Sequence, residues 1–256
     1  MHHQRALVRR PSSRLADGLL THLERRPVDS GLALRQWNDY CAVLRANGWE
    51  TIEAPPADDC PDGAFIEDTM VVYADLAVIS RPGAHERRAE LPTAELAVRT
   101  CGYRVARIVE PGTLDGGDVL KHGETVWVGV GGRTNRAGAQ QLAELLAPLG
   151  ATVIPVPVTK VLHLKSAVTA LPDGTVLVHP DTLDDASVYA SVLEVPETEG
   201  AHVVLLNENR LLISRSAPLT AQLLQQRGYD LVQVDIGEFE KLEGCVTCLS
   251  VRLRGA

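Results

Sequence analysis

Cys248 and His163 are the two residues of this chain whose side chains could act together in covalent chemistry. Cys248 lies in the segment KLEGCVTCLSVRL, in a run of Val, Thr and Leu that predicts a strand after a glycine turn. His163 lies between Leu162 and Leu164, where a turn precedes an apolar segment. A thiolate can attack an electrophilic carbon, and an imidazole can protonate the amine that leaves it. Taken singly, both residues are more often buried structural side chains.

Cys245 stands three residues before Cys248, which makes a C-x-x-C pair of the kind found in zinc sites and redox pairs. Residues three apart in an extended strand point to opposite faces, so we expect only Cys248 to line a site unless a bulge intervenes. The sequence has no second C-x-x-C and no histidine pair at zinc-ligand spacing. The five cysteines, an odd and unpatterned set, are expected to be free thiols that hold no metal.

Acidic residues cluster in two glycine-containing segments, CPDGAFIEDTMVV and TLDGGDVL. Asp62 and Asp118 fit positions that form turns. Glu67 and Asp68 follow apolar residues and lead into an apolar strand, so at least one must point into buried space and needs a cationic partner. Paired carboxylates in a closed pocket match the forked donors of a guanidinium group. The sequence therefore suggests a planar, cationic ligand.

Arg87 and Arg133 each follow the second strand of a predicted hairpin, in RPGAHERR and GGRTNRAGA. Surface salt bridges are the ordinary role of such residues. If the two side chains converged on a pocket, they would instead bind an α-carboxylate. The spacing leaves both interpretations open.

A helix followed by a short strand recurs along the chain, and each helix ends at a glycine, where a left-handed conformation is favoured. These glycines are Gly48, Gly102, Gly150 and Gly228. Between the units lie hairpin-like segments, and a weaker unit near residues 189–197 brings the number that fits to five. Repetition of one unit around an axis is typical of a propeller, although an ordinary two-layer α/β domain also fits the pattern.

Size and charge limit the classes of function. The chain has 256 residues, of which 45% are apolar, so it can bury a core without disulfides or a structural metal. Its formal net charge of -8 argues against a nucleic-acid-binding surface. No apolar run approaches the length of a membrane span, and the N-terminal segment lacks the apolar core of a signal peptide. We therefore expect a cytoplasmic protein with no nucleic-acid or membrane partner.

Seven short segments, taken in order, make the chain resemble the dimethylarginine dimethylaminohydrolases of the guanidino-group-modifying superfamily. They are RLADGL, PDGAFIEDT, RPGAHERR, LDGGDVL, GRTN, VLHLKS and GCVTCLSV. The resemblance runs from about residue 5 to the C-terminus. It implies a five-bladed α/β propeller, the pentein fold, built from ββαβ modules around a central active site and formed by one catalytic domain over residues 1–256.

The resemblance also implies roles for individual residues. Cys248 would be the nucleophile, His163 the general acid and base, and Asp115 the carboxylate that orients the histidine or touches the guanidinium. Some bacterial members have Glu in place of Asp115, which changes the reach of this carboxylate but not its charge. The implied substrate-binding residues are Leu19 through its backbone, Asp62 at the α-amino group, Glu67 and Asp68 at the guanidinium, Arg87 and Arg133 at the α-carboxylate, and Leu242 through its backbone near the nucleophile.

The implied reaction is hydrolysis of Nω-methylated L-arginines to L-citrulline, without a cofactor, by a monomer or homodimer whose partner is the small-molecule substrate. Arginine deiminases share the chemistry but are typically longer, and amidinotransferases are longer and need an amine acceptor. A non-enzymatic propeller would have no need for a matched cysteine and histidine. A C-x-x-C module would make Cys245 as important as Cys248.

Overall fold

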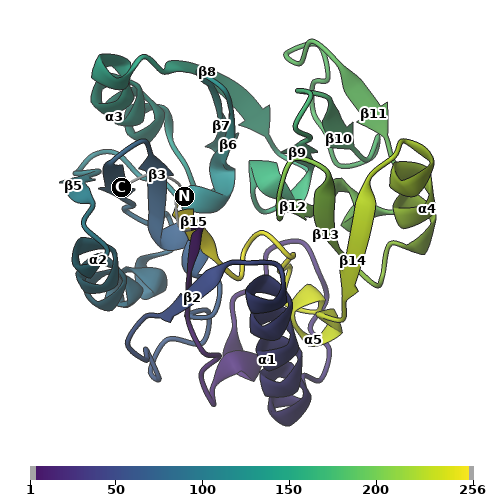
Figure 1. Cartoon of the computed structure of the whole chain (residues 1–256). Coiled ribbons are helices and arrows are strands. Elements are labelled where there is room, and N and C mark those ends of the chain that lie inside the picture. The colour runs from purple at the N-terminus through teal and green to yellow at the C-terminus, as the bar shows by residue number, and fades with distance from the viewer. Residues whose placement is uncertain (1–3, 254–256) are drawn as a thin grey trace.

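A computed structural model describes residues 4–253, so the first three and last three residues of the expected domain lie outside the described part of the chain. Within residues 4–253 the strands form five three-stranded sheets, set around a central axis like the blades of a pinwheel (Figure 1). In each sheet an inner strand pairs antiparallel with a middle strand, which pairs parallel with an outer strand. The expected five-bladed α/β propeller is confirmed.

The sheets follow one another along the chain, each ordered inner, middle, outer. The first is β15 (Val251–Leu253), β1 (Arg5–Val8) and β2 (Glu50–Glu53); the second is β3 (Met70–Tyr73), β4 (Leu76–Ile79) and β5 (Arg104–Arg107). The third is β6 (Val119–His122), β7 (Thr125–Gly131) and β8 (Thr152–Val158). The fourth is β9 (Val168–Ala170), β10 (Val176–Val178) and β11 (Val192–Glu194), and the fifth is β12 (Val203–Leu205), β13 (Arg210–Ser214) and β14 (Asp230–Val234).

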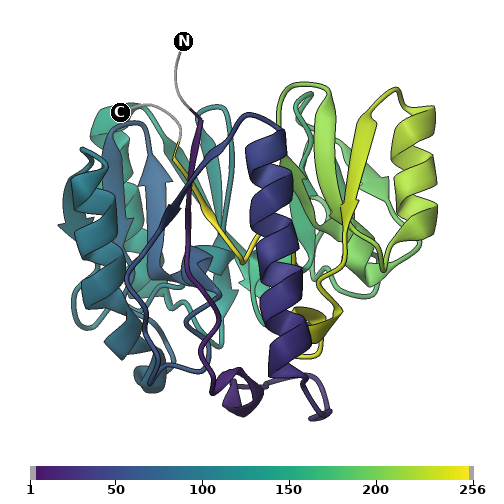
Figure 2. The same ribbon diagram turned by 60° about the horizontal axis from the view of Figure 1, so that its bottom comes forward.

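The two ends of the described chain close the ring. β15 pairs antiparallel with β1, with Leu7 opposite Val251 and Arg5 opposite Leu253. Both ends therefore lie on the same side of the molecule (Figure 2). Because the last strand completes the first sheet, the segment just before it, which holds Cys248, is fixed at the centre of the propeller.

Helices on the outside of the propeller join the middle strands to the outer strands (Figure 1). They are α1 (Ser30–Ala46), α2 (Leu91–Thr100), α3 (Arg136–Leu146) and α4 (Pro218–Gln226), and a short α5 (Gly237–Glu240) follows β14. Side chains cap two of them: Asp29 accepts from the Leu32 amide and Asn135 from the Gly138 amide. Among the described residues the fourth sheet has no helix between β10 and β11, which agrees with the weak unit expected there.

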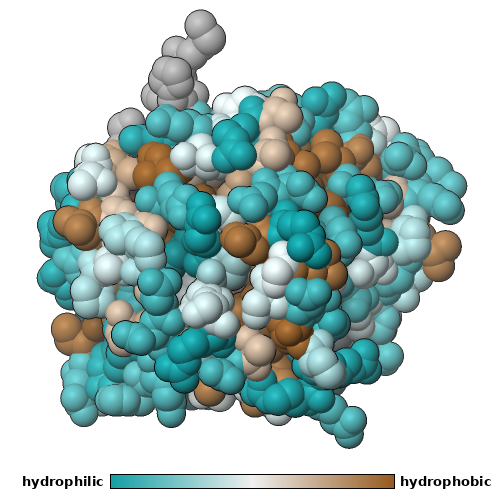
Figure 3. All heavy atoms as spheres, turned by 90° about the horizontal axis from the view of Figure 1, so that it is seen from below, coloured by the Kyte–Doolittle hydropathy of each residue, from teal (hydrophilic) through white to brown (hydrophobic). Residues whose placement is uncertain are grey.

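The core is divided into clusters of apolar side chains that fill the spaces between neighbouring sheets and helices. In one of them Leu142 and Leu146 of α3 pack with Leu114 and Val126. Outside, charged and polar residues dominate, and Figure 3 shows apolar residues only in small, scattered groups on the face it presents. Within the described residues, no helix combines the length and apolar character needed to cross a membrane.

The glycines expected at the helix ends have the left-handed backbone that the sequence pattern predicted. Gly48, Gly102, Gly150 and Gly228 have φ between +83° and +92°. Gly150 is exposed, and a methyl group there would meet no atom within 4 Å. Glycine is therefore favoured at position 150 because of its backbone conformation and not because of crowding.

Replacing Gly150 by Ala should lower the free energy of unfolding by about 1–2 kcal/mol, because a side chain is disfavoured in the left-handed region. Gly132→Ala is the matched control, since Gly132 is also exposed with open space around it but lacks the positive φ. Urea unfolding of both variants measures the difference. Equal stabilities would contradict the conformational explanation.

Candidate active site

The segments that precede the inner strands meet at one end of the propeller axis. Asp68 precedes β3, Asp115 precedes β6, His163 precedes β9 and Cys248 precedes β15. Since these strands occupy equivalent positions in their sheets, their starting ends lie together. A small pocket of about 20 Å³ lies here, lined by Cys248, His163 and Asp68 among others.

His163 is buried and held by a carboxylate behind it. Its Nε2 lies 3.0 Å from Oδ2 of Asp115, while Oδ1 of Asp115 accepts from the Gly83 amide at 3.1 Å. Asp115 is fully buried and does not line the pocket, so it touches the imidazole and not the pocket space. This arrangement leaves Nδ1 as the ring nitrogen available for proton transfer; it lies 3.7 Å from Oδ1 of Asp68.

Asp68 is fixed by Arg87, which is itself buried. Nη1 of Arg87 donates to Oδ2 of Asp68 at 2.5 Å, and Nε and Nη2 donate to the two oxygens of Glu90, each at 2.8 Å. Nη2 also donates to the carbonyl oxygens of Asp62 and Phe65. The prediction that at least one of Glu67 and Asp68 points into buried space and has a cationic partner is confirmed by Asp68. Arg87 lines the pocket, but most of its donors are already used.

The charges of these groups support one another. Burial alone would raise the pKa of Asp68, but the positive charges of His163 and Arg87 outweigh it and hold that pKa at about 2. Burial alone would lower the pKa of His163, but the charge of Asp68 and the hydrogen bond to Asp115 raise it to about 9. At neutral pH the histidine is therefore an imidazolium beside the ionised carboxylate of Asp68.

Cys245 and Cys248 lie in a turn and not in the expected strand. Residues 246–249 form the turn, and the Cys248 amide donates to the Cys245 carbonyl oxygen at 3.1 Å. As a result both sulfurs point the same way, with the two Sγ atoms 3.2 Å apart. The prediction that the thiols lie on opposite faces of a strand is wrong, because the chain turns before it enters β15. The expectation that Cys248 and not Cys245 lines the site agrees with the pocket lining.

The two thiols titrate as a pair. The hydrogen bond that Cys248 makes to Cys245 lowers the pKa of Cys245 against the effect of its burial. The same contact, together with burial and the charges of Glu67 and Asp68, raises the pKa of Cys248. In the absence of a ligand, Cys248 therefore holds its proton more tightly than an ordinary cysteine does.

A loop from Gly18 to Leu23 lies at the pocket and contributes Leu19 to its lining. The Leu19 amide donates to both oxygens of Asp62, at 3.1 and 3.2 Å, and Leu19 lines the pocket. Glu243 accepts from the amides of Thr21, His22 and Leu23. Burial raises the pKa of Asp62. The predicted residue Leu242 also lines the pocket, just before the glutamate that holds this loop.

Arg133 lies at the pocket too, and it is less constrained than Arg87. Its Nη2 donates to the hydroxyl of Thr21 at 3.2 Å, and the side chain is half-buried. Both arginines thus converge on one pocket, as a carboxylate-binding pair would require, but Arg133 keeps more donors for a ligand.

Glu67 faces a different space. Its Oε1 accepts from Nζ of Lys165 at 2.6 Å and from Nη2 of Arg252 at 2.5 Å, and it lines a larger cavity of about 410 Å³ among the inner strands. Its Oε2 is buried and has no hydrogen-bond partner among the described residues. Of the ten predicted site residues, the structure thus brings eight to the Cys248 pocket and leaves Glu67 and Asp115 outside its lining.

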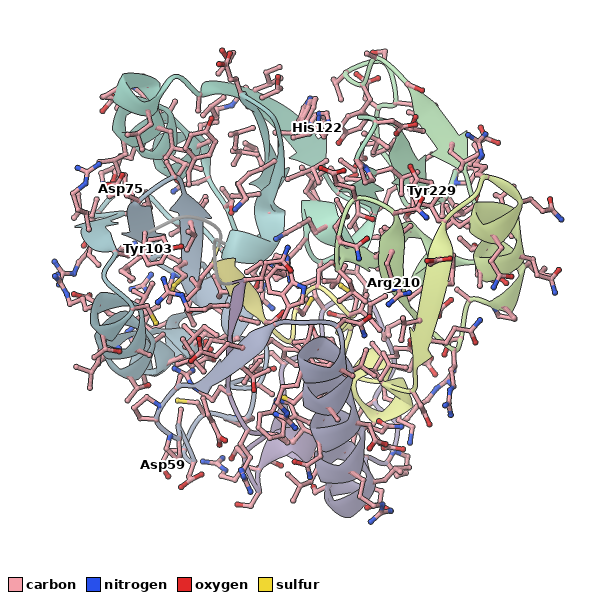
Figure 4. The ribbon with its side chains drawn as sticks, viewed as in Figure 1. Asp59, Asp75, Tyr103, His122, Arg210 and Tyr229 are labelled. Atoms are coloured by element: carbon pink, nitrogen blue, oxygen red, sulfur yellow. The ribbon has the colours of Figure 1, made fainter. Side chains whose placement is uncertain are left out.

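The larger cavity is lined mostly by inner strands and the segments next to them, and Cys248 is not in its lining. Residues close in sequence line different spaces. Cys248 lines the small pocket and Thr247 the large cavity, and His163 lines the small pocket and Lys165 the large cavity. His122, labelled in Figure 4, ends β6 at this cavity, with Nε2 3.2 Å from the Pro172 carbonyl oxygen.

Three supporting residues were missed from the sequence. Glu90 pairs with Arg87, which lies three residues before it in the helical segment His85–Glu90. This spacing of opposite charges could have indicated the pair. Asp118, which we expected to form a turn, is buried, accepts from the Leu164 amide at 2.9 Å, and so anchors the segment after His163. Burial raises the pKa of Asp118 to about 6. Glu243 had no signal in the sequence.

Comparison with known proteins identifies the family. A family model described as arginine deiminase matches residues 58–208. A dimethylarginine dimethylaminohydrolase of Streptomyces coelicolor is 62% identical over 254 residues, which cover 99% of this chain and 98% of that protein. The chain belongs to the dimethylarginine dimethylaminohydrolase family.

Other dimethylarginine dimethylaminohydrolases extend the match to solved structures. A protein of that name from Pseudomonas aeruginosa is 32% identical over 96% of this chain and 98% of its own length. The structure of a Cys-to-Ser variant of the P. aeruginosa enzyme with citrulline has a TM-score of 0.91 at 30% identity, over 99% of this chain and 100% of that one. The N-terminal domain of the arginine dihydrolase ArgZ, at 20% identity and a TM-score of 0.88 over 98% of each chain, shares the fold.

No group of three or more His, Cys, Asp or Glu side chains within residues 4–253 is arranged to hold a metal ion. The pocket residues that distinguish the site are instead a thiol, an imidazole and carboxylates. This set suits covalent and acid–base chemistry on a cationic carbon centre.

The raised pKa of His163 predicts how the free energy of unfolding depends on pH. Its folded-state pKa of about 9 exceeds the ordinary value of 6.5, so the imidazolium stabilises the fold below pH 6.5, and this contribution is lost as pH rises through about 9. Between these two pH values, the free energy of unfolding of wild type should fall on the order of 3 kcal/mol relative to that of a His163→Gln variant. Urea unfolding at several pH values measures both proteins. A difference that stays constant with pH would contradict the raised pKa.

Proposed function

We propose that the protein hydrolyses Nω-methylated L-arginines, asymmetric dimethylarginine and monomethylarginine, to L-citrulline and dimethylamine or methylamine. The observation that carries the proposal is one pocket lined by Cys248, His163, Asp68 and Arg133, with Asp115 fixing the histidine. Membership of the dimethylarginine dimethylaminohydrolase family supports the same reaction.

The guanidinium end of the substrate is assigned to the carboxylates. Asp68 stays ionised because its pKa is held at about 2, so it offers a fixed negative charge beside His163. A guanidinium matches a carboxylate with two parallel N–H donors. Glu67 lines the larger cavity, so we assign it to this end of the substrate through its charge, which also acts on Cys248.

The end of the substrate that carries the α-amino and α-carboxylate groups is assigned to Asp62, the loop from Gly18 to Leu23, and Arg133. Asp62, already fixed by the Leu19 amide, is the anionic partner for the α-amino group. Arg133 keeps free donors and is the principal ligand for the α-carboxylate. Arg87 contributes mainly by holding Asp68 and the backbone near Asp62. Backbone groups of Leu19 and Leu242 complete the contacts.

The reaction begins at Cys248. Without ligand its pKa is raised, so the nucleophile is protected as a thiol. A bound guanidinium places a positive charge beside the sulfur, which lowers the pKa and favours the thiolate. The thiolate then forms a bond to the guanidinium carbon, and a tetrahedral adduct results.

His163 completes the cycle. Its imidazolium donates a proton from Nδ1 to the methylamine nitrogen as the C–N bond breaks, which leaves a covalent thiouronium intermediate. The neutral imidazole then takes a proton from water, which adds to the same carbon. Breaking the C–S bond then releases L-citrulline, and the proton of the added hydroxyl group passes to the sulfur and restores the thiol. Asp115 holds Nε2 throughout and so keeps the ring in place.

Substrate entry requires the loop to move. A pocket of about 20 Å³ admits roughly one water molecule and no amino acid. The carboxylate of Glu243, which binds three successive loop amides, holds this closed form. Opening of residues 18–23 is therefore part of the proposed cycle.

The proposal extends to the whole chain: residues 1–256 act as one catalytic domain, a monomer or homodimer in the cytoplasm, with the methylated arginine as partner and without a cofactor. The family model of arginine deiminase raises a second candidate, hydrolysis of unmethylated L-arginine. The two candidates differ in the leaving group, an amine or ammonia.

The decisive experiment measures citrulline released by purified protein from asymmetric dimethylarginine and, separately, from L-arginine. We expect turnover of the methylated substrate and its loss in Cys248→Ala, since Cys248 is the cysteine that lines the pocket. A Cys101→Ser variant, altered at a thiol remote from the pocket, should behave as wild type. Preference for L-arginine would assign the protein as a deiminase, and turnover by Cys248→Ala would refute the covalent route.

Gly117 offers a test of the positioning of His163. A methyl group there would lie 2.5 Å from Oδ1 of Asp68 and 2.7 Å from Nδ1 of His163, so Gly117→Ala must push the pair apart. We expect turnover to fall on the order of 100-fold without loss of a titratable group. Gly237→Ala, where the nearest atom is 3.4 Å away, is the control. Unchanged turnover of folded Gly117→Ala would show that the His163–Asp68 distance is unimportant.

A further inference from the structure

Cys245 is a buried thiol that the proposed reaction does not use, yet it lies against the nucleophile. Its Sγ is 3.2 Å from Sγ of Cys248 and 3.1 Å from the hydroxyl of Thr247. The side chains of both cysteines are more than nine-tenths buried. A disulfide needs the two sulfurs about 2 Å apart, so a small movement within one turn is enough.

We propose that Cys245 and Cys248 form a site of oxidative modification, at which a hydroperoxide converts the two thiols into a disulfide and reversibly disables the nucleophile. The loss of activity rests on the proposed role of Cys248, whereas formation of the bond does not. The turn, which overturned our expectation of a strand, is the feature that makes the bond possible.

The chemistry balances with the hydroperoxide as sole oxidant. A thiolate sulfur of the pair attacks the terminal peroxide oxygen and forms an S–O bond as the O–O bond breaks, so the attacking cysteine becomes a sulfenic acid. The departing alkoxide or hydroxide takes up the proton that was released when the thiolate formed, and leaves as an alcohol or water. The second sulfur then attacks the sulfenic sulfur, and the hydroxide that departs takes up the remaining thiol proton as water. Both cysteines are oxidised and the peroxide is reduced.

Access and charge favour this pair over the other thiols. Cys248 lines the pocket, so a small peroxide that enters it meets this sulfur first, and Cys245 lies directly behind. The hydrogen bond between the two sulfurs lowers the pKa of Cys245, so the pair can hold a thiolate. A proton that passes from Cys248 to Cys245 across the 3.2 Å contact places this thiolate on the sulfur that lines the pocket. For Cys41, Cys60 and Cys101, which are also buried, burial raises the pKa and so disfavours the reactive thiolate.

A disulfide would also protect the nucleophile. A lone sulfenic acid at Cys248 can be oxidised further to the irreversible sulfinic acid, whereas a neighbouring thiol converts it into a bond that reductants cleave. Cys245 therefore acts as a resolving cysteine.

The test treats intact protein with hydrogen peroxide and follows two readouts, the mass of the tryptic peptide that holds both cysteines and citrulline release before and after dithiothreitol. In wild type we expect that peptide to lose two hydrogen atoms, activity to be lost, and dithiothreitol to restore both. Cys245→Ser keeps the contact to Thr247 and should instead gain oxygen at Cys248 and stay inactive after reduction. Cys245→Ala serves as a second variant should the first fold poorly.

Cys101→Ser is the matched control and should follow wild type in every readout. Oxygen addition in wild type without loss of hydrogen, or recovery by dithiothreitol that is equal in wild type and Cys245→Ser, would overturn the proposal. If the disulfide forms but the reduced protein releases no citrulline from either arginine, the oxidation site stands and the proposed function fails.

Discussion

The buried ion pair between Arg87 and Asp68 sets the charges on which the rest of the site depends. Arg87 is enclosed by Asp68, Glu90 and two carbonyl oxygens, and taking such charges out of water is costly unless each is paired. With Arg87 in place Asp68 stays ionised, and with Asp68 ionised the His163 proton is held. Removing the arginine would therefore change the protonation of a histidine it does not touch.

The propeller geometry explains why residues far apart in sequence form this site. Equivalent inner strands start at the same end of the axis, so the short segments before β3, β6, β9 and β15 meet there. Residues close together in these segments line different cavities: Asp68, His163 and Cys248 line the smaller one, and Glu67, Lys165 and Thr247 line the larger one. The smaller one holds the thiol, and the larger one holds the ion pairs of Glu67 with Lys165 and Arg252.

Sequence reasoning reached the repeated unit because its signals are local: a left-handed glycine such as Gly150 and alternating apolar residues do not depend on the rest of the fold. It found Cys248 and His163 by residue type and by resemblance. It failed at Cys245, because the strand preference of Val, Thr and Leu is overridden where the chain must turn into β15 to close the ring. It also missed Glu243, since the amides that this side chain binds lie more than two hundred residues away in sequence.

In the proposed reaction, a pKa of about 9 makes His163 a reluctant proton donor at neutral pH, and binding of the proposed substrate corrects this. A guanidinium bound against Asp68 adds a positive charge beside the imidazolium, which lowers the pKa of His163. The same charge lowers the pKa of Cys248, so one binding event prepares both the nucleophile and the acid. A neutral ligand of the same shape would leave the thiol protonated and the histidine charged. The buried carboxylates thus make the reaction selective for cations through the protonation states of the catalytic groups as well as through binding.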